Sequence, residues 1–196
     1  MSTEILSLVK GERVDITKTN PGLKTAAIGL GWDTSRSTQT YDLDAFALCL
    51  TNKKLVSLNE HVLYFSSPKK NGMPFILNEA LVHTGDNLTG DGDGDDETIL
   101  VNFSKIPAGV DEIVICANIY QAEQKRQNFG MVDNAFMRIY DFDTKAEIAR
   151  YDLTEDASSS NGMVFGKLYL NSGEWKFQAV GNAVNGDINK ICEQFK

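Results

Sequence analysis

The feature that most constrains the fold is a succession of short β-prone runs separated by turn residues. Side chains alternate between the two faces of a strand, so short runs of alternating or continuous apolar residues are typical of strands. The runs are Ile5–Val9, Ala26–Leu30, Asp42–Leu50, Val62–Phe65, Thr98–Phe103, Glu112–Tyr120, Ala135–Phe142, Glu147–Leu153, Met163–Asn171 and Glu174–Val180. Because no long helical pattern stands between them, the chain is predicted to be all-β, a two-sheet β-sandwich of mostly antiparallel strands.

Turn residues and two short helices complete this organisation. Asn161-Gly162 is one of several turn signals that separate the runs. Short helices are expected over Gln121–Gln127 and over Asp187–Phe195, where the apolar residues of the second segment share one face. With no linker, low-complexity tract or repeat in view, residues 1–196 are predicted to form a single domain.

Composition places the chain among globular proteins. Hydrophobic residues make up 42% and charged residues 23% of the chain. No apolar run approaches the roughly 18–20 residues that span a bilayer, and the N-terminus lacks the basic leader of a signal peptide. The cysteines Cys49, Cys116 and Cys192 are odd in number and widely spaced, which favours small buried hydrophobes over a disulfide framework or a zinc site. A cytoplasmic location is therefore expected.

Almost all of the negative charge lies in one segment. The formal net charge is -8, which argues against nucleic acid as a partner. Between Asn71 and Ser104 there are seven acidic residues and no Lys or Arg, so this window alone carries -7. A charge that served only solubility would be spread over the surface. The concentration of charge therefore indicates a bound cation.

The acidic loop, residues 83–98 (HTGDNLTGDGDGDDET), has the chemistry of a calcium site. Calcium takes roughly 6–8 oxygen ligands, whereas magnesium keeps more waters and zinc prefers His or Cys. Asp91, Asp93 and Asp95 alternate with glycines, which permit the positive φ angles of a tight wrapping loop. The only nitrogen ligand on offer is His83, at the edge of the loop. A solvated acidic loop without an ion is the alternative interpretation.

Two common calcium frames do not fit the loop. An EF-hand that began at Asp91 would need Gly at its sixth position, where Asp96 stands, and Glu at its twelfth, where Asn102 stands. The glycine-rich nonapeptide of β-roll proteins needs tandem copies, and this chain has one.

A second acidic element lies upstream of the loop. Asp33 ends the apolar run GLGWD, and Asp42 and Asp44 open the run YDLDAFALCL. Residues two apart in a strand point to the same face, so Asp42 and Asp44 are expected to present a carboxylate pair, unless they simply mark an exposed strand start. Together with the loop they would supply enough carboxylates for two calcium ions.

Six motifs in order carry a family resemblance: GLGWD, DLDA, HTGDNLTGDGDGDDE, RQNFGMVDNAFMRI, EIARYDLTEDAS and GEWKFQAVG. From about Gly29 to Gly181 the chain resembles the TerD family of bacterial tellurium-resistance and stress proteins. The resemblance implies a β-sandwich that binds two calcium ions and has no established enzymatic activity. Between Asn52 and Leu81 the sequence departs from the family pattern and carries added residues. The calcium ligands implied by the resemblance are Asp33, Asp42, Asp44, Asp86, Asn87, Asp93, Asp95, Asp96 and Glu97.

The function expected from these observations is that of a calcium-binding, non-catalytic stress-response protein of the tellurite, phage and colicin resistance type. Its calcium-ordered face would engage other proteins of the same stress operon. One alternative is a calcium-dependent membrane-surface module, although only Leu88 adds an apolar side chain to the loop tip. The other is a metal-dependent hydrolase, for which the chain offers clustered aspartates but no obvious general base. His61 and His83 have no nucleophile motif beside them, so a hydrolytic triad is not expected.

Overall fold

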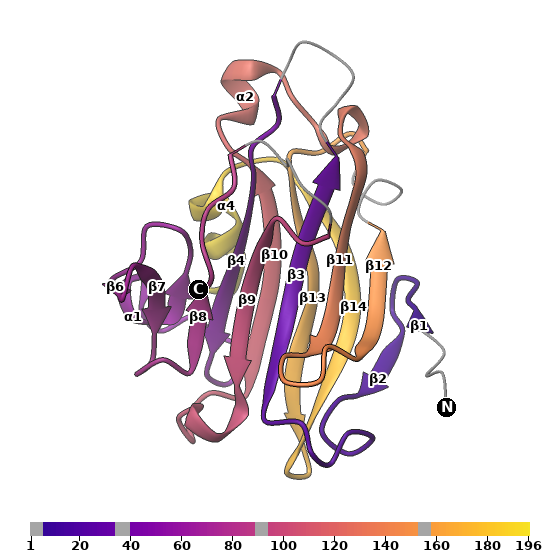
Figure 1. The fold of residues 1–196 in the computed structure, drawn as a ribbon. Helices are drawn as coiled ribbons and strands as arrows, with labels where there is room; N and C mark the ends of the chain where they lie inside the picture. Colours follow the sequence, from indigo (N-terminus) through magenta and orange to yellow (C-terminus); the bar gives the residue numbers. More distant parts are fainter. Residues whose placement is uncertain (1–5, 34–39, 89–93, 153–157) are drawn as a thin grey trace.

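The computed structural model describes residues 6–33, 40–88, 94–152 and 158–196. These residues form two β-sheets that face each other, with short helices at the periphery (Figure 1). One sheet has eight strands, in the order β1 (Leu6–Ser7), β12 (Glu147–Asp152), β11 (Asp133–Asp141), β3 (Thr25–Asp33), β9 (Glu97–Asn102), β8 (Leu81–His83), β7 (Met73–Ile76) and β6 (Lys69–Lys70). The other has six, in the order β2 (Arg13–Asp15), β14 (Glu174–Val184), β13 (Gly162–Asn171), β10 (Glu112–Ile119), β4 (Leu43–Leu50) and β5 (Val62–Leu63).

Within this described part the strand pairs are antiparallel, except for β1 and β12, which run parallel. The predicted two-sheet sandwich of mostly antiparallel strands is therefore confirmed. The α-helices are α1 (Leu58–His61), α2 (Ala122–Lys125) and α4 (Ile188–Cys192), and the 3-10 turns are η1 (Phe103–Lys105), η2 (Phe129–Met131) and η3 (Glu193–Phe195). Both expected helical segments are present, and α1 is an additional one.

The two faces of β4 explain its continuous apolar sequence. Leu43, Ala45, Ala47 and Cys49 point into the core between the sheets. The alternate residues Phe46, Leu48 and Leu50 belong to a second buried cluster, to which Ile191 and Cys192 of the C-terminal helix α4 contribute. A strand covered on both faces needs apolar residues at every position. Asp44 is the exception in β4, because it is a buried carboxylate with the parity of the outer cluster.

Several elements were not predicted because they are too short to carry a period. The strands β2, β6, β7 and β8 have two to four residues each, less than the usual strand length. Pro74 lies within β7 and lowers its strand signal further. The predicted burial of the three cysteines is confirmed, and all three are free thiols. Trp32 and Trp175 lie in the core, as expected.

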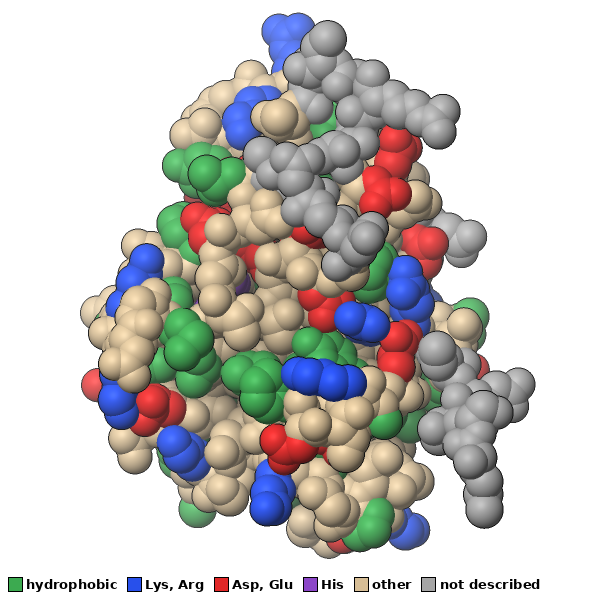
Figure 2. All heavy atoms as spheres, in the orientation of Figure 1, with side chains coloured by type: hydrophobic (Ala, Val, Ile, Leu, Met, Phe, Trp, Pro, Cys, Tyr) green, Lys and Arg blue, Asp and Glu red, His purple; other side chains and the backbone are tan. Residues whose placement is uncertain are grey.

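Four strand ends meet at one end of the sandwich. Leu30 of β3 is paired with Glu97 at the start of β9, and Asn118 near the end of β10 is paired with Asp44 near the start of β4. The acidic loop enters this end between β8 and β9 (Figure 1). Acidic side chains gather in the upper half of the face drawn in Figure 2, where this end of the molecule lies. The fold therefore brings the two acidic elements of the sequence together.

Candidate metal centre

Three carboxylates from two separate segments converge at this end. Asp42 lies just before β4, Asp44 is the second residue of β4, and Asp86 follows β8. One oxygen atom from each of the three lies within 4.8 Å of the others, so the group, called here the aspartate cluster, could hold a metal ion. The expected pairing of Asp42 and Asp44 on one face is confirmed by this arrangement.

Asp44 carries the largest electrostatic penalty in the cluster. Its side chain is buried, with 3% relative exposure, and it accepts a long hydrogen bond of 3.4 Å from the side-chain amide of Asn118. Burial raises the pKa of Asp44 to about 8, and the nearby charges of Glu97, Asp42 and Asp86 contribute to the rise. A bound cation would stabilise the ionised form and remove this penalty.

Asp42 supports the same conclusion. Burial is the main cause that raises the pKa of Asp42, the charge of Asp86 adds to it, and Lys125 partly offsets both. Its Oδ1 atom is buried and accepts no hydrogen bond from any described residue. The same holds for Oδ1 of Asn118, which lies across from Asp44 on β10. Buried oxygens without a donor are costly, and the one on Asp42 is suited to a cation that takes oxygen ligands.

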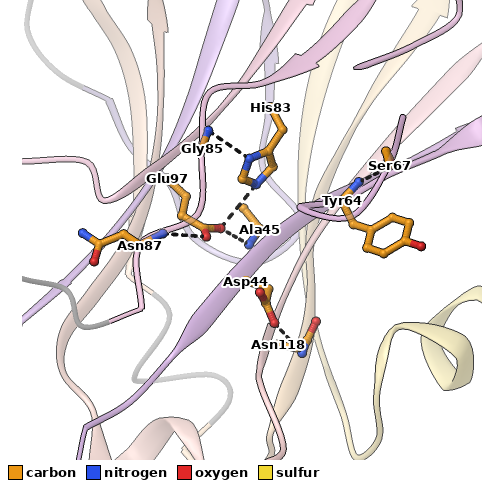
Figure 3. A network of polar contacts seen from close by, with 9 residues as sticks. All are labelled: Asp44, Ala45, Tyr64, Ser67, His83, Gly85, Asn87, Glu97 and Asn118. Atoms are coloured by element: carbon orange, nitrogen blue, oxygen red, sulfur yellow. Dashed lines mark hydrogen bonds and ion pairs between the residues drawn. The ribbon is translucent and has the colours of Figure 1, made fainter. Parts of the chain in front are cut away.

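Glu97 contacts β4 at Ala45, the acidic loop at Asn87, and His83 (Figure 3). Its side chain is buried, Oε2 accepts a hydrogen bond from the backbone N–H of Ala45 at 2.7 Å, and Oε1 accepts one from the backbone N–H of Asn87 at 3.4 Å. Burial raises the pKa of Glu97, and contacts with His83, Ala45 and Asn87 oppose the rise. Glu97 therefore joins the acidic loop to β4 and adds negative charge beside Asp44.

His83 is engaged with Glu97 and is not free to bind a metal. The backbone N–H of Gly85 donates to Nδ1 of His83 at 3.2 Å, which places the ring proton on Nε2. Nε2 lies 3.4 Å from Oε2 of Glu97, within ion-pairing distance but without hydrogen-bond geometry. The imidazole is fully buried. Sequence reasoning treated His83 only as an edge residue of the loop, and the structure makes it a support for Glu97.

Asp96 and Asn87 bind the loop to β3. Oδ2 of Asp96 accepts from the backbone N–H of Trp32 at 3.0 Å, and Oδ1 accepts from the side-chain amide of Asn87 at 2.8 Å. The backbone N–H of Asp96 donates to the carbonyl of Leu30 at 2.8 Å. These bonds fix the register in which the loop passes into β9.

Asp95 points to a different partner. Its two carboxylate oxygens accept from Nε of Arg138 at 2.7 Å and from Nη2 at 3.2 Å, a two-point ion pair. A Cβ atom on Gly29 would lie 2.2 Å from Cγ of Asp95, so the missing side chain at Gly29 provides the space that Asp95 occupies. Nη1 of Arg138 also contacts Glu147 at 3.1 Å. Asp95 thus anchors the loop to the sheet through Arg138.

The predicted ligands that the structure describes have four kinds of surroundings. Asp42, Asp44 and Asp86 form the cluster, and Asn87, Asp96 and Glu97 are joined by hydrogen bonds beside it. Asp95 pairs with Arg138, and Asp33, at the exposed end of β3, accepts a hydrogen bond from Asn134. The remaining predicted ligand, Asp93, lies outside the described residues. Asn118 and Arg138 were not predicted to take part. A polar residue in the apolar run EIVICANIY was a signal for Asn118, but no sequence signal linked Arg138 to Asp95, which lies 43 positions away.

The donor set of the site is limited in its chemistry. The aspartate cluster offers oxygen atoms only, and the imidazole of His83 contacts Glu97. Oxygen donors suit calcium and magnesium, whereas zinc and copper prefer nitrogen or sulfur. The residues present therefore fit a hard divalent cation.

Comparison with known proteins places this arrangement in a family. Residues 5–195 match the TerD domain family. The chain belongs to the TerD family. It is 43% identical over 193 residues to general stress protein 16U of Bacillus subtilis, and the matched residues cover 97% of this chain and 96% of that protein. It is 42% identical over 193 residues to the tellurium resistance protein TerD of Serratia marcescens, with 97% and 96% covered.

The TerD fold is also seen in a solved structure. A crystal structure of a homologue of the telluride resistance protein TerD from Streptomyces coelicolor A3(2) matches with a TM-score of 0.69 at 17% identity, over 87% of this chain and 96% of that one. The chain is thus a TerD-family protein related to stress and tellurium-resistance proteins, as the sequence motifs indicated. None of its described helices is long and apolar enough to cross a membrane.

Proposed function

We propose that this TerD-family protein is a non-catalytic calcium-binding module whose acidic end is ordered by the ion. The observation that carries the proposal is the aspartate cluster, in which Asp44 is buried beside Asp42 and Asp86 without a cationic partner among the described residues. Calcium supplies the missing positive charge and binds the carboxylate oxygens that the site offers.

Some residues of the site would bind the ion directly, and others would support them. Asp42, Asp44 and Asp86 would hold the ion, and Asn118 would hold Asp44 in place through its side-chain amide N–H. Glu97 and Asn87 support the segment that carries Asp86. The second ion implied by the family resemblance would draw on the part of the acidic loop that contains Asp93 and Asp96, and the stoichiometry of calcium binding tests this.

Calcium-dependent ordering suits an interaction module of a stress-response system. The like charges of such a segment repel one another until a cation neutralises them. Once the ion is bound, the loop presents one defined surface to a partner. We propose other proteins of the same stress operon as the partners.

Thermal unfolding with and without calcium tests the proposal. Because a ligand that binds only the folded state stabilises it by about 2.7 kcal/mol at a hundredfold excess over Kd, the Tm should rise by roughly 5–10 °C for a chain of this size. Calcium should also protect residues 83–98 from limited proteolysis. If millimolar calcium changes neither the Tm nor the cleavage pattern of the chelator-treated protein, the proposal fails.

A calcium-dependent membrane-surface module is the second candidate. Leu88 is 59% exposed and lies two residues from Asp86, so an apolar side chain stands beside the aspartate cluster. Calcium can bridge carboxylates to anionic lipid headgroups. Sedimentation with phosphatidylserine vesicles separates the candidates: calcium-dependent pelleting that is lost in Leu88→Ser supports membrane binding, and its absence supports the interaction module.

A further inference from the structure

A pocket of about 640 Å³ opens beside the aspartate cluster. Its walls come from Tyr64 and Phe65 after β5, from residues 120–124 after β10, and from residues 185–190 at the start of α4. Asp44 and Asn118 contribute to its lining. A volume in this range is typical of small-molecule sites.

One wall of the pocket is aromatic. The ring of Phe65 meets the ring of Tyr64 edge to face, at 5.6 Å between centroids, and the ring of Tyr120 in the same manner at 6.3 Å. Tyr120 is 40% exposed, and the Lys125 ammonium lies 5.5 Å from the centre of its ring. This wall offers flat apolar surface to a ligand.

The rest of the lining is rich in carboxamides. A carboxamide both donates and accepts hydrogen bonds, and so does a hydroxyl group, so the two are matched partners. The carboxamide residues that line the pocket are Asn118, Gln121, Gln124, Asn161, Asn185 and Asn189. Oδ1 of Asn161 is already used, because it accepts from the backbone N–H of Gly186 at 2.8 Å.

Asn118 has an unused acceptor in the pocket lining. The residue is 4% exposed, its amide N–H group donates to Asp44 at 3.4 Å, and its Oδ1 atom is buried without a donor among the described residues (Figure 3). Buried acceptors of this kind are nearly always satisfied in folded proteins. The geometry indicates a ligand group that donates a hydrogen bond at the floor of the pocket.

The lining favours a neutral ligand. Besides Asp44, it carries the carboxylates Glu123 and Asp187 and one lysine, Lys190, so a phosphate or carboxylate finds no excess of positive charge there. A fully apolar ligand would leave the carboxamides without hydrogen-bond partners. A neutral molecule with several hydroxyl groups and one apolar face satisfies both requirements.

We propose that this pocket binds a neutral sugar ring, either as a free monosaccharide or as the ribose of a nucleoside. A ring hydroxyl donates to Oδ1 of Asn118, and the apolar face of the ring lies against the aromatic wall at Tyr120. The pocket does not require calcium. One consequence does rest on the proposed calcium function: because Asp44 belongs to both sites, sugar and calcium alter each other's affinity by the same factor.

Saturation-transfer NMR and calorimetry test the proposal on the full chain. The probes are glucose, galactose, mannose, N-acetylglucosamine, ribose, adenosine and uridine, with inorganic phosphate and citrate as anionic counter-probes. At least one sugar or nucleoside should bind saturably, and the anions should not. Binding by the monosaccharides identifies a free sugar, and binding by the nucleosides alone identifies the ribose source.

Matched tyrosine variants locate the binding. Tyr120→Ala should weaken the affinity for the probe roughly tenfold, which is the effect expected from the loss of one packed aromatic contact. Tyr120→Phe should keep the wild-type affinity. Tyr169→Ala is the control, because Tyr169 also packs beneath a lysine, Lys167, but lies outside the pocket. If no sugar or nucleoside binds, if an anion binds instead, or if Tyr120→Ala has no effect, the proposal is wrong. The calcium response of Tyr120→Ala, measured by the Tm, shows separately whether the metal centre is intact.

Discussion

Replacing Asp44 by Asn should stabilise the protein without calcium and reduce its response to calcium. Asp44 is buried, and its pKa is raised from 3.8 to about 8 by burial and by Glu97, Asp42 and Asp86. Asn is close in shape, and its oxygen can still accept from Asn118. The substitution removes a buried charge but also removes a proposed calcium ligand, so the two effects have opposite signs.

The magnitude follows from the pKa shift. Between about pH 4 and pH 8 the folded state holds a proton on Asp44 that the unfolded state has lost, so the stability of the calcium-free protein falls as pH rises across this window. A rise of the Asp44 pKa from 3.8 to about 8 corresponds to a loss of about 5 kcal/mol above pH 8. Asp44→Asn escapes this loss, so its advantage should grow from pH 4 to pH 8 and then level off.

Urea unfolding of chelator-treated protein at several pH values measures the effect. The control is Asp143→Asn, because Asp143 is exposed and lies outside the cluster, and its difference from the wild type should stay flat with pH. With calcium at pH 8.5 the order should reverse, and the wild type should be the more stable protein. An apo Asp44→Asn protein that is less stable than the wild type at pH 8.5 would refute the reasoning.

Three further predictions concern the loop anchor and the thiols. Arg138→Met should lower the free energy of unfolding in urea by about 3 kcal/mol, because it removes the arginine that pairs with the nearly buried Asp95 carboxylate. Adding Asp95→Asn to the same chain should recover part of that loss. Equal stability of Arg138→Met and the wild type would contradict this prediction. Gly29→Ala should cost roughly 1–3 kcal/mol, because its Cβ would overlap Asp95, and an unchanged urea midpoint would count against this packing. Burial raises the pKa of Cys116 and raises the pKa of Cys49 to about 12, so neither should react with a thiol reagent at pH 8 until the chain unfolds, and rapid labelling of the folded protein would disprove this.

The strands of the core were predictable because they are long enough to show a pattern. The runs that became β4 and β10 are apolar at nearly every position, and the structure covers both of their faces. The short strands β6, β7 and β8 offer two to four residues each, so no period could reveal them. Of these, β6 and β7 lie in the segment where the chain departs from the family pattern.

The candidate site was predictable only where the chemistry is local. Asp42 and Asp44 are two residues apart, so strand periodicity alone places them together. Asp86 joins them only through tertiary structure. Asp95 shows most clearly what the sequence cannot predict. Its spacing in the acidic loop suits a calcium ligand, but its side chain fills the space at Gly29 on β3 and pairs with Arg138 on β11.

Calorimetric titration of the chelator-treated chain with calcium tests the central claim most directly. The proposed function predicts saturable binding of two ions per chain, and one ion fewer in Asp44→Asn, because Asp44 is the buried member of the aspartate cluster. Magnesium at the same concentration should bind more weakly, since it gives up its own waters reluctantly. The absence of saturable calcium binding, or binding that Asp44→Asn leaves unchanged, would contradict the assignment of the metal centre.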